Sequence, residues 1–222
     1  VAVGGGSLLI CRDGWTFRDP APALHPDNHA IAWERDGSGF FLGNDGGVFL
    51  IKFTDPLTID DGFNILPITQ FGGLSVGKTN PKVVAGGTQD NGVVYSTNGV
   101  HWWNIGGDGG GTQVDPFNHE KMYGTFGVFG GGGLAFRRHR KFGSAGWGDV
   151  NSGIETPCGQ WWTQVRSDQA FPPYHYSQCG GYIYLSKNEG SSWSKMNSTP
   201  LPNGETWHLS ISRGSSPNIY AA

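Results

Sequence analysis

The sequence has few charged residues and no long apolar run, and each shortage excludes a class of protein. Lysine, arginine, aspartate and glutamate make up 15% of the 222 residues, and the net charge is −3. Nucleic-acid binding requires a basic surface that neutralises phosphates, so DNA and RNA are not expected partners. No apolar run approaches the roughly 20 residues that cross a bilayer as a helix, so no transmembrane segment is expected.

Cysteine is also scarce, with only Cys11, Cys158 and Cys179. Three cysteines allow at most one disulfide within the chain, and their spacing matches no zinc site. Cys158 and Cys179 fall in the same sequence repeat and are the pair that an oxidising compartment would join. The other interpretation is three buried thiols that pack as small apolar side chains. The sequence leaves both interpretations open.

A helical period is missing as well, because no stretch repeats apolar residues over three helical turns. The chain is rich instead in glycine, proline and aromatic residues, with 38 Gly, 13 Pro, 13 Phe, 9 Trp and 7 Tyr. Runs of roughly four to eight β-forming residues alternate with turns of Gly, Pro, Asn and Asp, which is typical of strands joined by hairpins. The sequence therefore predicts an all-β protein with an aromatic core.

Three short phrases mark a repeat in this strand pattern. Thr69-Gln70, Thr112-Gln113 and Thr163-Gln164 each open a β-like run that is followed by a turn and further strands. A period of roughly 40 to 50 residues made only of strands is typical of a propeller blade, which is a four-stranded antiparallel sheet. The predicted fold is an all-β propeller with full blades at 29–66, 69–105, 112–150 and 161–196, and partial blades at 1–19 and 206–222.

The two ends leave two arrangements open. Residues 1–19 read as the last strands of one blade, and residues 206–222 read as the first two strands of another. Either the ends complete one shared blade, or this single domain is a piece of a longer propeller, and the second arrangement is the prediction. In the first full blade, residues 63–66 are expected to form the outermost strand.

A turn motif recurs between the expected third and fourth strands of three blades. Residues 186–193 fit Ser-x-Asp-x-Gly-x-x-Trp with asparagine in the aspartate position, and shortened versions occur at 96–102 and 11–17. The motif resembles the Asp-box of sialidase-like, sortilin-like and xyloglucanase-like propellers. Its carboxylate or amide accepts backbone N–H groups within the turn, and its aromatic ring packs between sheets. The structural positions predicted from it are Asp13, Asn98, Ser186, Asn188, Gly190 and Trp193.

A second resemblance covers most of residues 25–126. Four segments follow one another as in secreted bacterial Asp-box propellers that are loosely labelled glycosyl hydrolases: residues 25–30, 43–48, 87–92 and 106–110. The segment around Asp45 also resembles the turn that carries a catalytic aspartate in xyloglucanases, with Gly46 where that family has valine. The resemblance implies a polymer-handling protein that is secreted or lies on the cell surface.

Topology predicts which acidic residues share a face. In an antiparallel blade, turns between second and third strands lie on the same face as the connections to the next blade. Asp45 and Asp90 occupy such turns, and Asp108 lies on such a connection. Glycoside hydrolysis requires two carboxylates, one of them kept protonated by burial, so Asp90 and Asp108 are the candidate catalytic pair, with Asp45 as a substitute. The alternative is that each aspartate only forms a tight turn.

His25-x-Asp27-x-His29 is expected on that same face. Alternation along an extended segment puts the three side chains on one side, where they form either a metal site or a hydrogen-bonded plug. The Asp-rich turns are a second candidate metal site, for Ca²⁺, although no loop has the spacing of a dedicated calcium loop. No other cofactor is expected.

Exposed aromatic residues complete the candidate ligand-binding surface. Trp161, Trp162 and Trp207 lie near the starts of first strands, where they either stack on sugar rings or pack between blades. The function predicted is an extracellular propeller module that binds a polysaccharide or a protein. A glycoside hydrolase with paired aspartates is one alternative, and a structural unit of an extracellular assembly, joined to further blades or subunits, is another.

Overall fold

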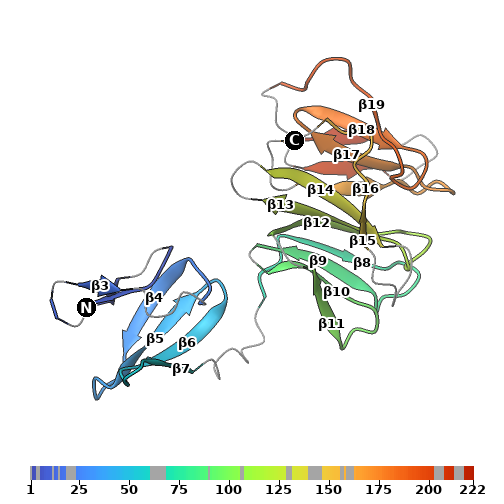
Figure 1. Ribbon diagram of the computed structural model, residues 1–222. Helices are drawn as coiled ribbons and strands as arrows, with labels where there is room; N and C mark the ends of the chain where they lie inside the picture. Colours follow the sequence, from blue (N-terminus) through green and yellow to red (C-terminus); the bar gives the residue numbers. More distant parts are fainter. Residues whose placement is uncertain are drawn as a thin grey trace. The chain divides into compact units, whose positions relative to one another are not determined.

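The computed structural model shows a chain of antiparallel β-sheets (Figure 1). The chain divides into two compact units, Val1–Ile68 and Thr69–Ala222, and each is described by itself. None of the residues that the structure describes belongs to a helix long and apolar enough to cross a membrane. The described residues are all those of the chain except 1, 4–5, 12, 15, 19–23, 61–68, 90, 106–107, 129–131, 140–146, 156–157, 159–162, 203–207 and 213–217.

The first unit holds two sheets, drawn in blue and cyan in Figure 1. The three-stranded sheet runs in the order β1 (Ala2–Val3), β2 (Leu9–Cys11) and β3 (Phe17–Arg18). The four-stranded sheet runs in the order β4 (Asn28–Trp33), β5 (Gly39–Asn44), β6 (Gly47–Lys52) and β7 (Thr58–Asp60). All neighbouring strands are antiparallel, so each sheet is a simple meander.

The second unit holds three four-stranded meanders and a strand pair. The first meander is β8 (Gly73–Val76), β9 (Val84–Thr88), β10 (Gly92–Ser96) and β11 (Trp102–Ile105). The second is β12 (Asp108–Val114), β13 (Met122–Val128), β14 (Gly132–His139) and β15 (Trp147–Asp149). The third is β16 (Val165–Ser167), β17 (His175–Cys179), β18 (Tyr182–Ser186) and β19 (Ser194–Lys195), and the pair is β20 (Leu209–Ile211) and β21 (Ile219–Ala221).

Apolar side chains on one face of a sheet pack against the next sheet. In the first unit, Phe40 and Leu42 lie on the same face of β5 because side chains alternate along a strand. They pack in one cluster with Ile10 of β2 and with Leu8, which precedes that strand. In the second unit, three clusters each join one sheet to the next. They are Val83, Ala85, Val114 and Met122; Tyr123, Val165, Tyr184 and Trp193; and Tyr176, Ile183 and Leu209.

Glycines allow β12 to approach the sheets on either side of it closely. A Cβ atom on Gly87 would lie 1.7 Å from the carbonyl O of Gly110, and one on Gly111 would lie 2.7 Å from the carbonyl O of Thr163. Because both obstacles are backbone atoms, no side-chain rotation could relieve them. The glycine-rich sequence of β12 is therefore required by the packing of neighbouring sheets.

The turn between the first and second strands repeats in all four sheets of the second unit. The backbone N–H of the residue after the first strand donates to the carbonyl O of the residue six positions later. The pairs are Gly77–Val83, Asp115–Lys121, Asp168–Tyr174 and Ser212–Asn218. Consecutive sheets are therefore built on one plan, and the predicted fold class, four full four-stranded blades with a partial blade towards each end, is confirmed.

Several strand boundaries differ from the sequence prediction. The outermost strand of the first full sheet is Thr58–Asp60, which pairs with β6, whereas the predicted segment 63–66 lies outside the described residues. β12 begins at Asp108 rather than at Thr112, because the glycines that read as a turn continue the ladder with β13 through a bulge. Asp108 is therefore a strand residue that pairs with Gly127, and its predicted place on a connection is wrong.

Candidate functional site

Two of the predicted site residues meet in the first unit. Nε2 of His29, on β4, lies 2.5 Å from Oδ1 of Asp45, in the turn between β5 and β6. The register of β4 with β5 shifts between Asn28 and Ala30, so His29 is the extra residue of a bulge, and bulges re-aim side chains. The side chains of His29 and Asp45 remain 66% and 30% exposed, so the pair presents fixed hydrogen-bonding groups to solvent.

The turn that carries Asp45 is braced by its neighbours. The Asn44 side chain donates from Nδ2 to the carbonyl O of His25, at 2.8 Å, and accepts the N–H of Gly46 at its Oδ1, at 2.9 Å. Gly46 is needed here because a Cβ atom would lie 2.5 Å from the Cβ of His25. Sequence analysis did not single out Asn44, which positions Asp45 through the backbone of the turn.

His25, Asp27 and His29 do not alternate along an extended segment as predicted. Asp27 has a φ of +62°, in the left-handed region, so the backbone turns at that residue. Nδ1 of His25 lies 3.1 Å from the carbonyl O of Pro26, while His29 contacts Asp45. Among the described residues, no group of three or more His, Cys, Asp and Glu side chains is placed to hold a metal ion.

The remaining predicted site residues belong to the other unit or lie outside the described residues. Asp108 is half-buried at the start of β12 and belongs to the second unit, whereas Asp45 belongs to the first. Their convergence on one rim, and their catalytic role, stay predictions. Asp90, Trp161, Trp162 and Trp207 lie outside the described residues.

A hairpin turn with a dense hydrogen-bond network joins β18 to β19. The Ser186 hydroxyl lies 2.9 Å from Oδ1 of Asn188 and accepts the N–H of Gly190 at 2.8 Å. Oδ1 of Asn188 also accepts the N–H of Ser192 at 2.9 Å. Trp193 closes the motif: it is buried between two sheets, and its Nε1 donates to the carbonyl O of Val150 at 2.7 Å.

The same pattern occurs in two other hairpins. Between β10 and β11, Oδ1 of Asn98 accepts the N–H of His101 at 2.8 Å, and the hydroxyl of Ser96 accepts that of Gly99 at 2.9 Å. Between β2 and β3, Oδ1 of Asp13 accepts the N–H of Thr16 at 2.7 Å. These polar side chains bond within their own turns, which stabilises the hairpins.

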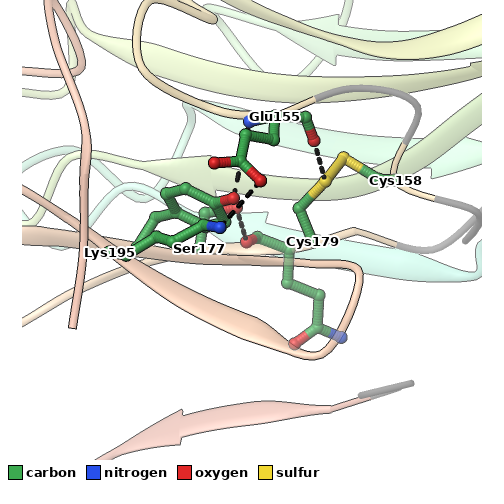
Figure 2. Close-up of a disulfide and its surroundings, with 7 residues drawn as sticks. Glu155, Cys158, Ser177, Cys179 and Lys195 are labelled. Atoms are coloured by element: carbon green, nitrogen blue, oxygen red, sulfur yellow. Dashed lines mark hydrogen bonds and ion pairs between the residues drawn. A yellow bond between two sulfur atoms is a disulfide. The ribbon is translucent and has the colours of Figure 1, made fainter. Parts of the chain in front are cut away.

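A disulfide joins Cys158 to Cys179, and both residues are buried (Figure 2). Cys179 ends β17, and Cys158 lies on the connection that leads from β15 to β16. The carbonyl O of Glu155, on that connection, lies 3.0 Å from Sγ of Cys179, and its carboxylate pairs with Nζ of Lys195 at 2.7 Å (Figure 2). The disulfide interpretation of the two cysteines therefore holds in the structure, while Cys11 is a buried thiol.

The structure also contains a buried polar cluster that sequence analysis missed. His175 on β17 has no exposed surface; its Nδ1 lies 2.8 Å from the Ser167 hydroxyl, and its Nε2 lies 3.2 Å from the Tyr123 hydroxyl. Burial lowers the pKa of His175 to about 4, so the ring is neutral at pH 7. A single histidine inside a strand carries no sequence motif, so its burial could not be predicted.

A second missed group is Asp168, which is buried in a turn between first and second strands. Its Oδ1 accepts the N–H groups of Ala170 and Tyr174, and its Oδ2 accepts the hydroxyl of Tyr176 at 3.3 Å. Burial and the charge of Asp168 raise the pKa of Tyr176 to about 12. Both missed groups stabilise the fold and are closed to ligands.

No protein-family model matches this chain, and no curated protein matches it. Solved structures do. The β-propeller domain of Myceliophteria thermophila Cps50 (Swd1) is 10% identical, with a TM-score of 0.51 over 88% of this chain. The extracellular domains of two B. thetaiotaomicron proteins, BT4673 of a one component system and BT3049 of a hybrid two component system, are 10% and 9% identical, with TM-scores of 0.50 and 0.51 over 99% of this chain.

This chain spans only part of those structures, covering 62% of the Cps50 domain and 29% and 30% of the two extracellular domains. At such low identity the likeness concerns the fold alone. Together with the consecutive four-stranded sheets and their repeated turns, it shows that the chain has a β-propeller fold.

Proposed function

We propose that this chain is an extracellular β-propeller module that binds a polysaccharide or a protein, and that its three bonded hairpin turns are Asp-boxes. The Cys158–Cys179 disulfide supports an oxidising compartment, because cytosolic proteins rarely keep disulfides. Two of the similar structures are extracellular domains, which agrees with secretion or a place on the cell surface. Protein partners include further subunits of an extracellular assembly.

The observation that carries a binding role is the exposed His29–Asp45 pair. A general acid for glycoside hydrolysis requires a carboxyl group that burial keeps protonated. Asp45 contacts an imidazole and solvent instead, so it suits a group that accepts hydrogen bonds from a ligand. Imidazole and carboxylate together offer both a donor and acceptors, which match the hydroxyl groups of a sugar or the amides of a protein.

Binding to an array of plant and bacterial polysaccharides, combined with pull-down from extracellular protein fractions, tests this proposal. Asp45→Asn and His29→Gln are expected to weaken binding about tenfold each, because the first replaces a charged carboxylate oxygen with an amide donor and the second replaces the imidazole that contacts Asp45. Asp36→Asn is the matched control, since Asp36 is an exposed aspartate in the turn between β4 and β5, at the other end of the same sheet.

Two results would contradict a pure binding role. Binding that survives both changes would remove the His29–Asp45 pair from the site. Release of reducing sugar from any polysaccharide, lost in Asp108→Asn, would identify the chain as a glycoside hydrolase instead.

A further inference from the structure

In the second unit, the turns that join the first strand of each sheet to its second strand form another exposed surface. Three of these turns, 77–83, 115–121 and 168–174, contact one another. Nζ of Lys78 donates to Oε1 of Gln169 at 2.9 Å, and the rings of Phe117 and Phe171 meet edge to face with centroids 5.3 Å apart. Residues from three consecutive sheets therefore form one continuous surface.

Phe171 is the most exposed large apolar side chain among the described residues, at 82%. An exposed phenylalanine on a loose loop would need no explanation. This turn is fixed, however, because Asp168 is buried and holds the N–H groups of Ala170 and Tyr174 on either side of Phe171. Phe117 supports the ring from one side and leaves the rest of it to solvent. The exposed ring is thus held in place before any ligand arrives.

Two lysines flank this turn, and neither has an acidic partner in the described part of the chain. Nζ of Lys78 lies 5.8 Å from the centroid of Phe117, and Nζ of Lys187 lies 5.4 Å from that of Tyr174, which is 36% exposed. Among the described residues, neither lysine forms an ion pair, whereas three other lysines each pair with a glutamate: Lys52 with Glu34, Lys121 with Glu189, and Lys195 with Glu155. Positive charge at this turn is therefore left available for a ligand.

We propose that this surface, formed by Phe171, Tyr174, Lys78 and Lys187 and here called the Phe171 platform, binds an acidic polysaccharide whose sugars carry carboxylates. A sugar ring places its C–H groups on the flat aromatic ring and directs its carboxylate towards a lysine. An aspartate or glutamate side chain would satisfy a lysine but carries no ring to stack on Phe171, whereas an acidic sugar carries the ring and the carboxylate in one residue. The platform does not rest on the His29–Asp45 proposal, because it uses other residues and another unit of the chain.

Affinity electrophoresis of the full chain in polygalacturonate, in an uncharged β-glucan and in polyglutamate tests the proposal. We expect retardation by polygalacturonate alone, weakened by added salt because exposed ion pairs are screened. Phe171→Ala, and Lys78→Gln combined with Lys187→Gln, are each expected to weaken the affinity about tenfold. The matched controls are Tyr220→Ala, which removes an aromatic side chain that is 62% exposed on β21, and Lys52→Gln, which removes a paired lysine.

Thermal unfolding of each variant establishes that it is folded. No retardation in polygalacturonate, or retardation that Phe171→Ala leaves unchanged, would overturn the proposal. Stronger retardation by polyglutamate would assign the surface to an acidic protein instead. Asp45→Asn is expected to leave polygalacturonate binding intact, which separates failure of this proposal from failure of the first.

Discussion

Two boundaries between neighbouring sheets of the second unit are closed in different ways. Where β12–β15 meets β16–β19, here called the Gly111 boundary, the N–H of Gly111 donates directly to the carbonyl O of Thr163 at 3.3 Å. The buried Thr125 hydroxyl donates to that same oxygen at 2.6 Å. Backbone meets backbone, so nothing larger than a hydrogen atom fits on Gly111.

Where β16–β19 meets β20–β21, here called the Gln164 boundary, two longer side chains span the gap. Oε1 of Gln164 accepts the N–H of Leu209 at 3.1 Å, and Nε of Arg166 donates to the carbonyl O of Leu209 at 3.2 Å. Burial lowers the pKa of Arg166, whose partners among the described residues are the carbonyl groups of Val165 and Leu209. Close backbone contact gives a boundary that depends on residue size, whereas side-chain contact gives one that tolerates substitution.

The largest effect is expected from Gly111→Val. The added side chain would lie within 2.7 Å of the carbonyl O of Thr163 and 3.0 Å of the Cα of Gln164, so the two strands would have to separate. We expect a loss of about 4 kcal/mol in the free energy of unfolding. Urea unfolding followed by tryptophan fluorescence measures it. Gly148→Val on β15 is the control, because a Cβ atom there meets open space. Equal stability of the two variants would refute the size argument.

Removal of the disulfide should be the next largest effect. Cys158 and Cys179 join the connection that precedes β16 to the end of β17, beside the Gly111 boundary. For a separation of 21 residues, loss of the cross-link releases loop entropy worth about 3 kcal/mol in the unfolded chain. Cys158→Ser combined with Cys179→Ser is compared with the parent by urea unfolding, with Cys11→Ala as the control. A stability change no larger than that of the control would contradict this role.

The sheets of both units could be predicted because strand and turn residues repeat, but the phrases that revealed the repeat are not equivalent in space. The shared hydrogen bond starts at Gly77, Asp115 and Asp168. Thr69, Thr112 and Thr163 precede those positions by eight, three and five residues respectively, so the Thr-Gln phrases lie at different heights along the sheets. Proline and asparagine indicate the positions of the turns more reliably, because proline fixes φ and asparagine tolerates a left-handed φ.

The candidate site was only partly predictable. Asp45 was found because it follows a strand in a tight turn, whereas its contact with His29 depends on a bulge that arises from the pairing of β4 with β5. Pairing register is a property of two strands, so a single segment cannot reveal it. The predicted alternation around Asp27 failed because this residue has a left-handed φ, a conformation that aspartate tolerates but does not require, so its sequence does not reveal it.

Low pH is expected to lower the free energy of unfolding through His175, whose ring contacts Tyr123 across the Gly111 boundary. Its pKa of about 4 in the folded state lies below the unfolded value of about 6.5, so the unfolded chain gains a proton first as the pH falls. Stability is therefore lost from about pH 6.5 down to about pH 4, with a loss of about 2 kcal/mol between pH 7 and pH 5. Urea unfolding of the parent and of His175→Gln at both pH values isolates this contribution. Equal pH dependence of the two proteins would exclude His175 as its source.

The smallest effects are expected at the Gln164 boundary. Gln164→Leu removes the acceptor of the buried Leu209 N–H and should cost about 1 kcal/mol. Arg166→Met keeps an apolar stem and removes a partly buried charge that has no carboxylate partner among the described residues, so its loss should fall below about 1 kcal/mol. Urea unfolding of both variants and of Gly111→Val ranks the two boundaries by the loss in the free energy of unfolding that each substitution causes. If Gln164→Leu proved as costly as Gly111→Val, side-chain and backbone contacts would constrain the stacking of sheets equally, and the contrast between the boundaries would be wrong.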